Sequence, residues 1–162
     1  YELTKDKQWL TIRDNMLSKL EAISADNKTG LIPDFIWVEG DKVRAAEPDT
    51  VESANDGYYS YNACRLPYNL AQSKDEKSQK MLKKMLSFFL NQEKIYAGYN
   101  LKGKALNSNQ AGSFTAPVFY AANNNIEFRK LVQQNKYLFM QGLPSDNYYD
   151  AAVTTMIALE TL

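Results

Sequence analysis

The sequence predicts an all-α fold in which two concentric layers of helices are arranged as in an α/α toroid. Segments 58–71, 113–122 and 148–162 carry small or apolar residues on most faces, which is the pattern of buried helices. Segments 75–91 and 126–139 alternate with them and carry one apolar stripe each. This alternation fits an inner and an outer layer. An α-solenoid would alternate in the same way, but the chain lacks the fixed-period repeat that a solenoid needs.

The predicted helices number six, and six helices make half of an (α/α)6 ring. We therefore expect this chain alone to expose an apolar edge. A missing N-terminal part of the same domain, or self-association, would cover that edge. A helical scaffold that binds protein partners through its apolar stripes is an alternative interpretation of the same pattern.

The chain begins with a predicted helix over residues 5–24, where apolar residues recur at spacings of three and four. The members of this stripe are Trp9, Ile12, Met16, Leu20 and Ile23. A polar, glycine-containing turn at 26–30 ends the helix. Residues 35–38 and 43–45 then predict a small β-hairpin, and residues 44–57 follow as a loop.

The helix over 58–71 is predicted to be kinked or interrupted near Pro67, because proline lacks a backbone donor. Ser73 or Asp75 would cap the helix over 75–91, whose apolar stripe faces away from a row of lysines. A loop at 93–112, rich in glycine, separates that helix from the last three.

Composition excludes several classes of function. Nineteen basic residues balance nineteen acidic ones, so charge gives no reason to expect nucleic acid or an anionic membrane as a partner. The single Cys64 excludes an intramolecular disulfide and a Cys-cluster metal site, and the absence of histidine removes the commonest metal ligand and the usual triad base. We therefore expect no metal and no cofactor. Carboxylates remain as the acid-base groups of choice.

Polar groups and aromatic rings are densest over residues 52–71. Glu52, Asn62 and Arg65 combine a carboxylate, an amide and a guanidinium. Sugar rings are commonly held by such groups together with aromatic faces. The candidate aromatic platforms are Tyr58, Tyr59, Tyr61, Trp9, Trp37 and Tyr99. Asp34 is either a structural residue or part of the same groove.

Four motifs follow in the order seen in glycoside hydrolase family 8, which this chain resembles from about residue 25 to its end. They are Gly30-Leu-Ile-Pro-Asp-Phe, Glu52-Ser with Asp56-Gly57, Tyr61-Asn-Ala-Cys-Arg-Leu-Pro, and Tyr148-Tyr-Asp-Ala-Ala. The resemblance implies an endo-acting, inverting hydrolase of β-1,4-linked polysaccharide: β-glucan or cellulose, chitosan, or xylan. It also implies a bacterial-type secreted or cell-surface protein, although no signal-peptide pattern is present in this chain.

The same resemblance implies that residues 1–162 are the C-terminal part of a single catalytic domain. Family members carry their general acid, a glutamate, in an N-terminal half that has no counterpart here. We therefore expect this chain alone to be inactive. A carbohydrate-binding pseudo-enzyme, which keeps the groove without the chemistry, is the principal alternative.

Many family members carry Asp as the general base where this chain has Asn62, and an amide cannot accept that proton. A subgroup rich in chitosanases and licheninases has Asn here and looks to use a glutamate ten residues upstream, which in this chain is Glu52. Asn62 would then orient the water or a sugar hydroxyl, and Arg65 would hold an oxygen through its donor fork. Asp56 is expected to cap the following helix, and Cys64 to be a small buried side chain.

Overall fold

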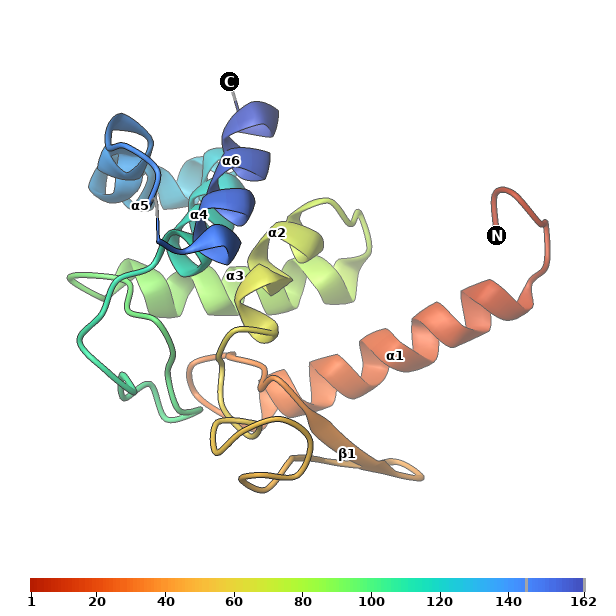
Figure 1. The fold of residues 1–162 in the computed structure, drawn as a ribbon. Helices are drawn as coiled ribbons and strands as arrows, with labels where there is room; N and C mark the ends of the chain where they lie inside the picture. Colours follow the sequence, from red (N-terminus) through yellow and green to blue (C-terminus); the bar gives the residue numbers. More distant parts are fainter. Residues whose placement is uncertain (145, 162) are drawn as a thin grey trace.

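The computed structural model of the chain describes residues 1–144 and 146–161. Its elements, coloured along the chain in Figure 1, are α1 (Gln8–Ala25), β1 (Ile36–Glu39), β2 (Lys42–Ala45), η1 (Ala63–Arg65), α2 (Leu66–Ala71), α3 (Glu76–Leu90), α4 (Gly112–Asn123), η2 (Ile126–Phe128), α5 (Arg129–Asn135), η3 (Lys136–Met140) and α6 (Tyr148–Thr161). The three η elements are short 3-10 helices.

Helix α4 lies at the centre, where it contacts α2, α3, α5 and α6. It is buried along nearly its whole length, which confirms the prediction for an inner helix with small and apolar residues on every side. Its neighbours α2 and α6 flank it, and α3 and α5 lie outside this group (Figure 1). Inner and outer helices therefore alternate along the chain, as predicted.

The main core lies between α3 and the inner helices. The stripe on α3 is buried as predicted: Met81, Leu82, Met85, Leu86 and Phe89. Asp75 caps the start of α3, because its carboxylate accepts the backbone N–H of Lys77. The aromatic rings of Tyr59, Tyr99 and Phe114 complete this core from the loops and from α4.

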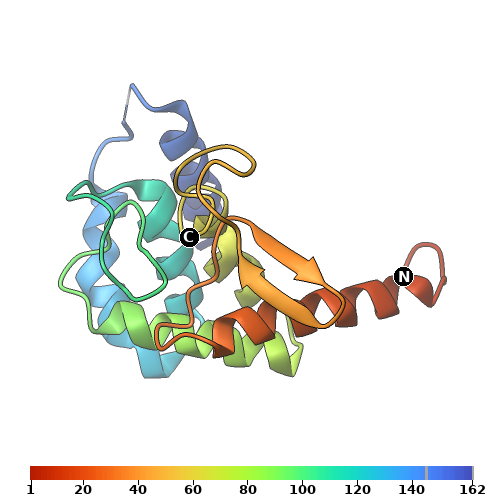
Figure 2. The same ribbon diagram turned by 90° about the horizontal axis from the view of Figure 1, so that it is seen from below.

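The apolar stripe of α1 is only partly covered. Ile23 is buried and Leu20 packs on the core, but Trp9, Ile12 and Met16 are 53%, 46% and 61% exposed. The half of α1 that carries these three residues projects from the body (Figures 1 and 2). The spacing of the apolar residues predicted the helix correctly. Among the described residues, however, no element covers the apolar side chains in the N-terminal half of α1.

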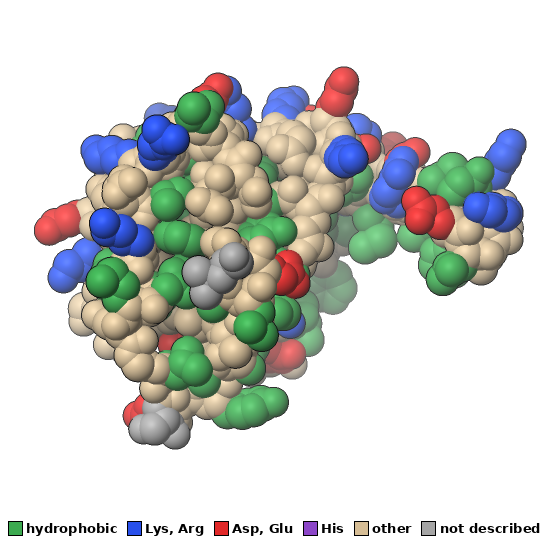
Figure 3. Space-filling model, turned by 90° about the horizontal axis from the view of Figure 1, so that it is seen from above, with side chains coloured by type: hydrophobic (Ala, Val, Ile, Leu, Met, Phe, Trp, Pro, Cys, Tyr) green, Lys and Arg blue, Asp and Glu red, His purple; other side chains and the backbone are tan. Residues whose placement is uncertain are grey.

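Helix α6 is also less buried than the sequence predicts. Val153 and Ile157 pack against α4, but Met156 and Leu159 on the other side are exposed. Figure 3 shows apolar side chains on the surface of the body as well as on the projecting segment. An apolar edge is therefore exposed in this chain, at both α1 and α6.

Two other predicted helices have different bounds. The helix predicted over 58–71 begins only at η1, because Tyr59 pairs with Tyr99 in an isolated β-bridge and residues 58–62 are therefore not helical. The helix predicted over 126–139 is divided into η2, α5 and η3.

The predicted hairpin is confirmed. Strands β1 and β2 pair antiparallel, with Trp37 opposite Arg44, and Gly40 takes a positive φ of 58° in the turn. The hairpin lies along α1, where the Lys19 ammonium donates to the carbonyl of Gly40 at 2.7 Å (Figure 2). Among the described residues, no helix is both long enough and apolar enough to cross a bilayer.

Candidate active site

Glu52 and Asn62 meet in space although ten residues separate them. The Asn62 amide nitrogen Nδ2 donates a hydrogen bond to Glu52 Oε2 at 2.9 Å. Glu52 is exposed and Asn62 is half-buried at the start of η1. An amide that donates a hydrogen bond to a carboxylate fixes the direction of that carboxylate. The pair is therefore an oriented carboxylate that solvent can reach.

The loop of Glu52 is held by a buried carboxylate. Asp56, 1% exposed, accepts the backbone N–H groups of Val51 at 2.6 Å, Glu52 at 3.1 Å and Ser53 at 2.9 Å. Burial raises its pKa, but these N–H donors outweigh burial and hold the pKa of Asp56 below its usual value. Asp56 thus binds the loop before it, and the prediction that it caps the following helix is wrong.

The backbone on either side of Asn62 is held by a second carboxylate. Asp34 Oδ1 accepts the backbone N–H groups of Ser60 at 2.9 Å and Ala63 at 2.7 Å. Burial raises the pKa of Asp34, and the negative charge of Glu52 raises it further. Of the two roles expected for Asp34, these contacts match the structural one.

The segments that carry the two aspartates are hydrogen-bonded to each other. The Asp34 N–H donates to the carbonyl of Tyr58 at 2.8 Å, and the Phe35 N–H donates to the carbonyl of Asp56 at 2.9 Å. A Cβ at Gly57 would collide with the backbone oxygen of Ala46, so glycine permits the close approach of the loop to the end of β2. These hydrogen bonds therefore join the loop that carries Glu52 to the turn that carries Asn62.

Tyr59 and Tyr99 are core residues and do not offer faces to a sugar. Both side chains are fully buried, and their backbones exchange two hydrogen bonds of 3.0 and 2.9 Å. The Tyr59 ring packs against Phe89 and Phe114, with centroid distances of 5.7 and 6.0 Å. Burial raises the pKa of Tyr59 well above its usual value and that of Tyr99 to about 12.

Tyr61 is the exposed member of the four predicted tyrosine platforms. It is 47% exposed, and its ring meets Phe114 and Tyr149 edge to face, with centroid distances of 5.1 and 6.1 Å. The Tyr149 hydroxyl donates to the Tyr61 carbonyl at 2.9 Å. Tyr149 was missed as a site residue, although the Tyr148-Tyr-Asp-Ala-Ala motif contains it. The turn before η1 and the start of α6 meet at this contact.

The other predicted residues are placed differently. Arg65 is exposed at the end of η1 and has no ion-pair partner among the described residues. Tyr58 is half-buried and lines a shallow depression beside Asn100. Trp37 lies on the hairpin, where its indole N–H donates to Glu47 at 2.8 Å and Arg44 lies 5.8 Å from its ring centroid. Trp9 lies in the first turn of α1, where its side chain is exposed.

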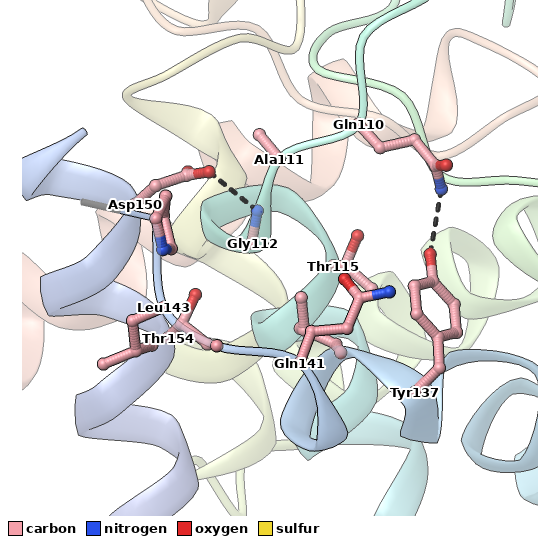
Figure 4. Close-up of a pocket in the computed structure, with 12 residues that line it drawn as sticks. Gln110, Ala111, Gly112, Thr115, Tyr137, Gln141, Leu143, Asp150 and Thr154 are labelled. Carbon is pink, nitrogen blue, oxygen red and sulfur yellow. Dashed lines mark hydrogen bonds between the residues drawn. The ribbon is translucent and has the colours of Figure 1, made fainter. Parts of the chain in front are cut away.

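A pocket of about 290 Å³, which the sequence did not predict, lies at the starts of α4 and α6 (Figure 4). Asp150 accepts the backbone N–H groups of Gly112 at 3.0 Å and Ser113 at 2.9 Å, and so caps α4. Across the pocket, the Gln110 amide donates to the Tyr137 hydroxyl at 2.9 Å (Figure 4). Neither Glu52 nor Asn62 lines this pocket. Within residues 1–144 and 146–161, no three His, Cys, Asp or Glu side chains are grouped to hold a metal ion.

Comparison with known proteins places these features in context. The profile described as "Glycosyl hydrolases family 8" matches residues 1–161. A β-glucanase of Niallia circulans is 31% identical over 125 residues, which cover 70% of this chain and 31% of that protein. An endoglucanase of Bacillus sp. (strain KSM-330) is 29% identical over 136 residues, which cover 77% of this chain and 29% of that protein.

A solved structure has the same fold. The apo structure of a β-1,3-1,4-glucanase from Paenibacillus sp. X4 superposes with a TM-score of 0.87 at 24% identity. The match covers 98% of this chain and 44% of that one, and it confirms the α/α toroid fold. The chain therefore spans less than half the length of each of these proteins.

Proposed function

Because the chain belongs to glycosyl hydrolase family 8, we propose that it supplies the general base of an endo-acting β-glucan hydrolase that inverts the anomeric carbon. Glu52 is the base in this proposal. The observation that carries it is the 2.9 Å hydrogen bond from the Asn62 amide to the Glu52 carboxylate. This bond joins the two residues that the family resemblance pairs, in an exposed position that a polysaccharide can reach.

In the proposed reaction, the Glu52 carboxylate takes a proton from a water as the water oxygen attacks the anomeric carbon. The bond from that carbon to the glycosidic oxygen breaks, and the leaving oxygen receives a proton from a carboxylic acid on the other side of the sugar. Inverting enzymes hold the two carboxyl groups roughly 6.5–9.5 Å apart, with the water between them. Asn62 donates one amide N–H to Glu52 and keeps its other groups for the water or a sugar hydroxyl.

β-Glucan is the substrate class we favour, because the two curated relatives are named β-glucanase and endoglucanase. Chitosan and xylan are the other candidates within the family resemblance. The exposed ring of Tyr61, supported by Tyr149, would stack on a sugar face, and Arg65 would bind a sugar oxygen. Such polymers are too large to enter a cell, so we propose that the enzyme acts outside it.

The chain is proposed to form the C-terminal part of one catalytic domain, whose remaining part supplies the general acid. The 44% coverage of the Paenibacillus glucanase supports this, as do the exposed apolar faces of α1 and α6. The remaining part of the ring would cover those faces. By itself the 162-residue chain is then expected not to hydrolyse β-glucan, since acid catalysis typically contributes about 10²–10⁴-fold.

The test uses the longest natural protein that carries this sequence, assayed on barley β-glucan. Glu52→Gln keeps the size of the side chain but removes proton acceptance, so kcat should fall by about 10²-fold or more with KM nearly unchanged. Glu39→Gln on the hairpin makes the same chemical change at another exposed glutamate and should leave kcat unchanged. Retention of most activity by Glu52→Gln would reject Glu52 as the base.

Two further results separate the alternatives. Proton NMR of the first product should show the α-anomer from a β-linked substrate, which is the signature of inversion. A natural protein that binds β-glucan and shows no hydrolysis would favour the carbohydrate-binding pseudo-enzyme instead.

A further inference from the structure

We propose that Asp56 is a positioning residue, which fixes the backbone from which Glu52 reaches Asn62. The inference rests on the proposed role of Glu52 as the base. Asp56 does not touch the proposed reacting atoms. It acts through the backbone of the loop, and its effect on catalysis would be to keep the Glu52 carboxylate in one direction.

The contacts of Asp56 are concentrated on Glu52 and its two neighbours. The carboxylate accepts the N–H groups of Val51, Glu52 and Ser53, and both of its oxygens take part. A buried carboxylate is costly unless donors surround it, and here these donors are backbone groups of a single turn. No basic side chain pairs with Asp56 among the described residues. The negative charge of Asp56 therefore orders the turn that carries Glu52.

The turn is also fixed relative to Asn62. The carbonyl of Asp56 accepts the Phe35 N–H, and the neighbouring Asp34 carboxylate holds the N–H groups on both sides of Asn62. The Asn62 amide then returns to Glu52. These bonds form one continuous network. In it the backbone around Glu52 is held by Asp56, and the backbone around Asn62 is held by Asp34. Loss of the Asp56 carboxylate removes the hydrogen bonds of this network that hold the backbone of Glu52.

The kinetic test is a double-mutant cycle in the longest natural protein that carries this chain. Asp56→Asn keeps the shape but loses the charge and one acceptor oxygen, so kcat should fall about 10- to 100-fold at nearly constant KM. In a Glu52→Gln background, the same change should lower the residual kcat less than about twofold, because no base remains to be positioned. Asp49→Asn, an identical change at an exposed position of the same loop, should leave kcat unchanged. Equal losses in both backgrounds would show a merely structural role and overturn the proposal.

A second readout does not depend on activity. In the 162-residue chain, the side-chain NH₂ proton of Asn62 that bonds Glu52 should have a shifted NMR signal, which Glu52→Gln perturbs. Asp56→Asn should perturb it in the same direction, whereas Asp49→Asn should not. An unchanged Asn62 signal in Asp56→Asn would overturn the proposal even if no β-glucan hydrolysis were found.

Circular dichroism identifies a variant that fails to fold. If Asp56→Asn does so, Asp56→Glu keeps the charge but lengthens the side chain by one methylene. This variant should displace the turn and perturb the Asn62 signal. A folded Asp56→Glu protein with the wild-type signal and the wild-type kcat would equally reject the proposal.

Discussion

Replacement of Gly57 by alanine tests whether the Glu52 loop needs its close contact with the end of β2. The new Cβ would lie far inside 3.0 Å of the Ala46 backbone oxygen, a separation that Cβ atoms essentially never show, so the backbone must move. Three hydrogen bonds restrain it: Asp34 N–H to Tyr58, Phe35 N–H to Asp56, and Ala46 N–H to Phe35.

The expected cost follows from those contacts. Overpacking against backbone costs about 1–3 kcal/mol, and the loss of one of the three bonds adds about 0.5–1.5 kcal/mol. The reduced entropy of the unfolded chain returns about 0.4–1 kcal/mol. Gly57→Ala should therefore lower the free energy of unfolding by about 2 kcal/mol, the midpoint of these ranges.

Urea unfolding of the 162-residue chain, followed by circular dichroism, measures this loss. Gly142→Ala is the control, because a Cβ at Gly142 meets nothing within 4 Å and the backbone there does not take a positive φ. The control should be neutral or slightly stabilising. Equal urea midpoints for the two variants would refute the close approach of the loop to Ala46.

The remaining predictions concern the exposed edge and pH. Joint replacement of Ile12 and Met16, which are 46% and 61% exposed, by glutamine should lower hydrophobic-dye binding and self-association of the chain without loss of helix content; light scattering that finds wild type and variant equally monomeric would contradict this. Burial is the main cause that raises the pKa of Asp34 above 3.8, so the folded state favours its protonated form. The contribution of this protonated carboxyl to the free energy of unfolding is complete below the unfolded pKa and is lost as pH rises through the raised folded pKa. Asp34→Asn keeps an acceptor for both N–H groups, so its urea midpoint should change less than that of wild type from about pH 4 to about pH 6, and identical changes would count against the assigned shift.

The family resemblance predicted roles for Glu52 and Asn62 in one site but not the hydrogen bond that joins them in the structure. The supports of this pair were not predictable, because the N–H groups that Asp34 and Asp56 bind are selected by the path of the backbone, which no side-chain pattern records. Periodicity likewise predicted α1 and its apolar face. It could not say whether that face has a partner, since a stripe specifies a direction and not what lies there.

The tyrosines show the same limit. Tyr59 and Tyr61 are two residues apart and look alike in sequence, yet one is fully buried and the other is 47% exposed. The β-bridge from Tyr59 to Tyr99 turns the first ring into the core, and the turn that follows turns the second outward. This difference depends on a contact with a residue forty positions away in the chain. The local sequence does not record that contact, so both rings were predicted to stack on a sugar.

Cys64 is a natural probe of local opening in this chain. It is the single cysteine of the sequence, and its fully buried thiol donates to the Tyr61 carbonyl at 3.2 Å and lies 3.5 Å from the Tyr149 hydroxyl. Burial raises the pKa of this thiol to about 11, so the reactive thiolate is scarce at neutral pH. A thiol reagent can reach the sulfur only when the contact between the Tyr61–Cys64 segment and the start of α6 separates. The rate of its labelling is therefore a clock for local opening at the end of the molecule where Asn62 lies, read at one atom and without any introduced probe.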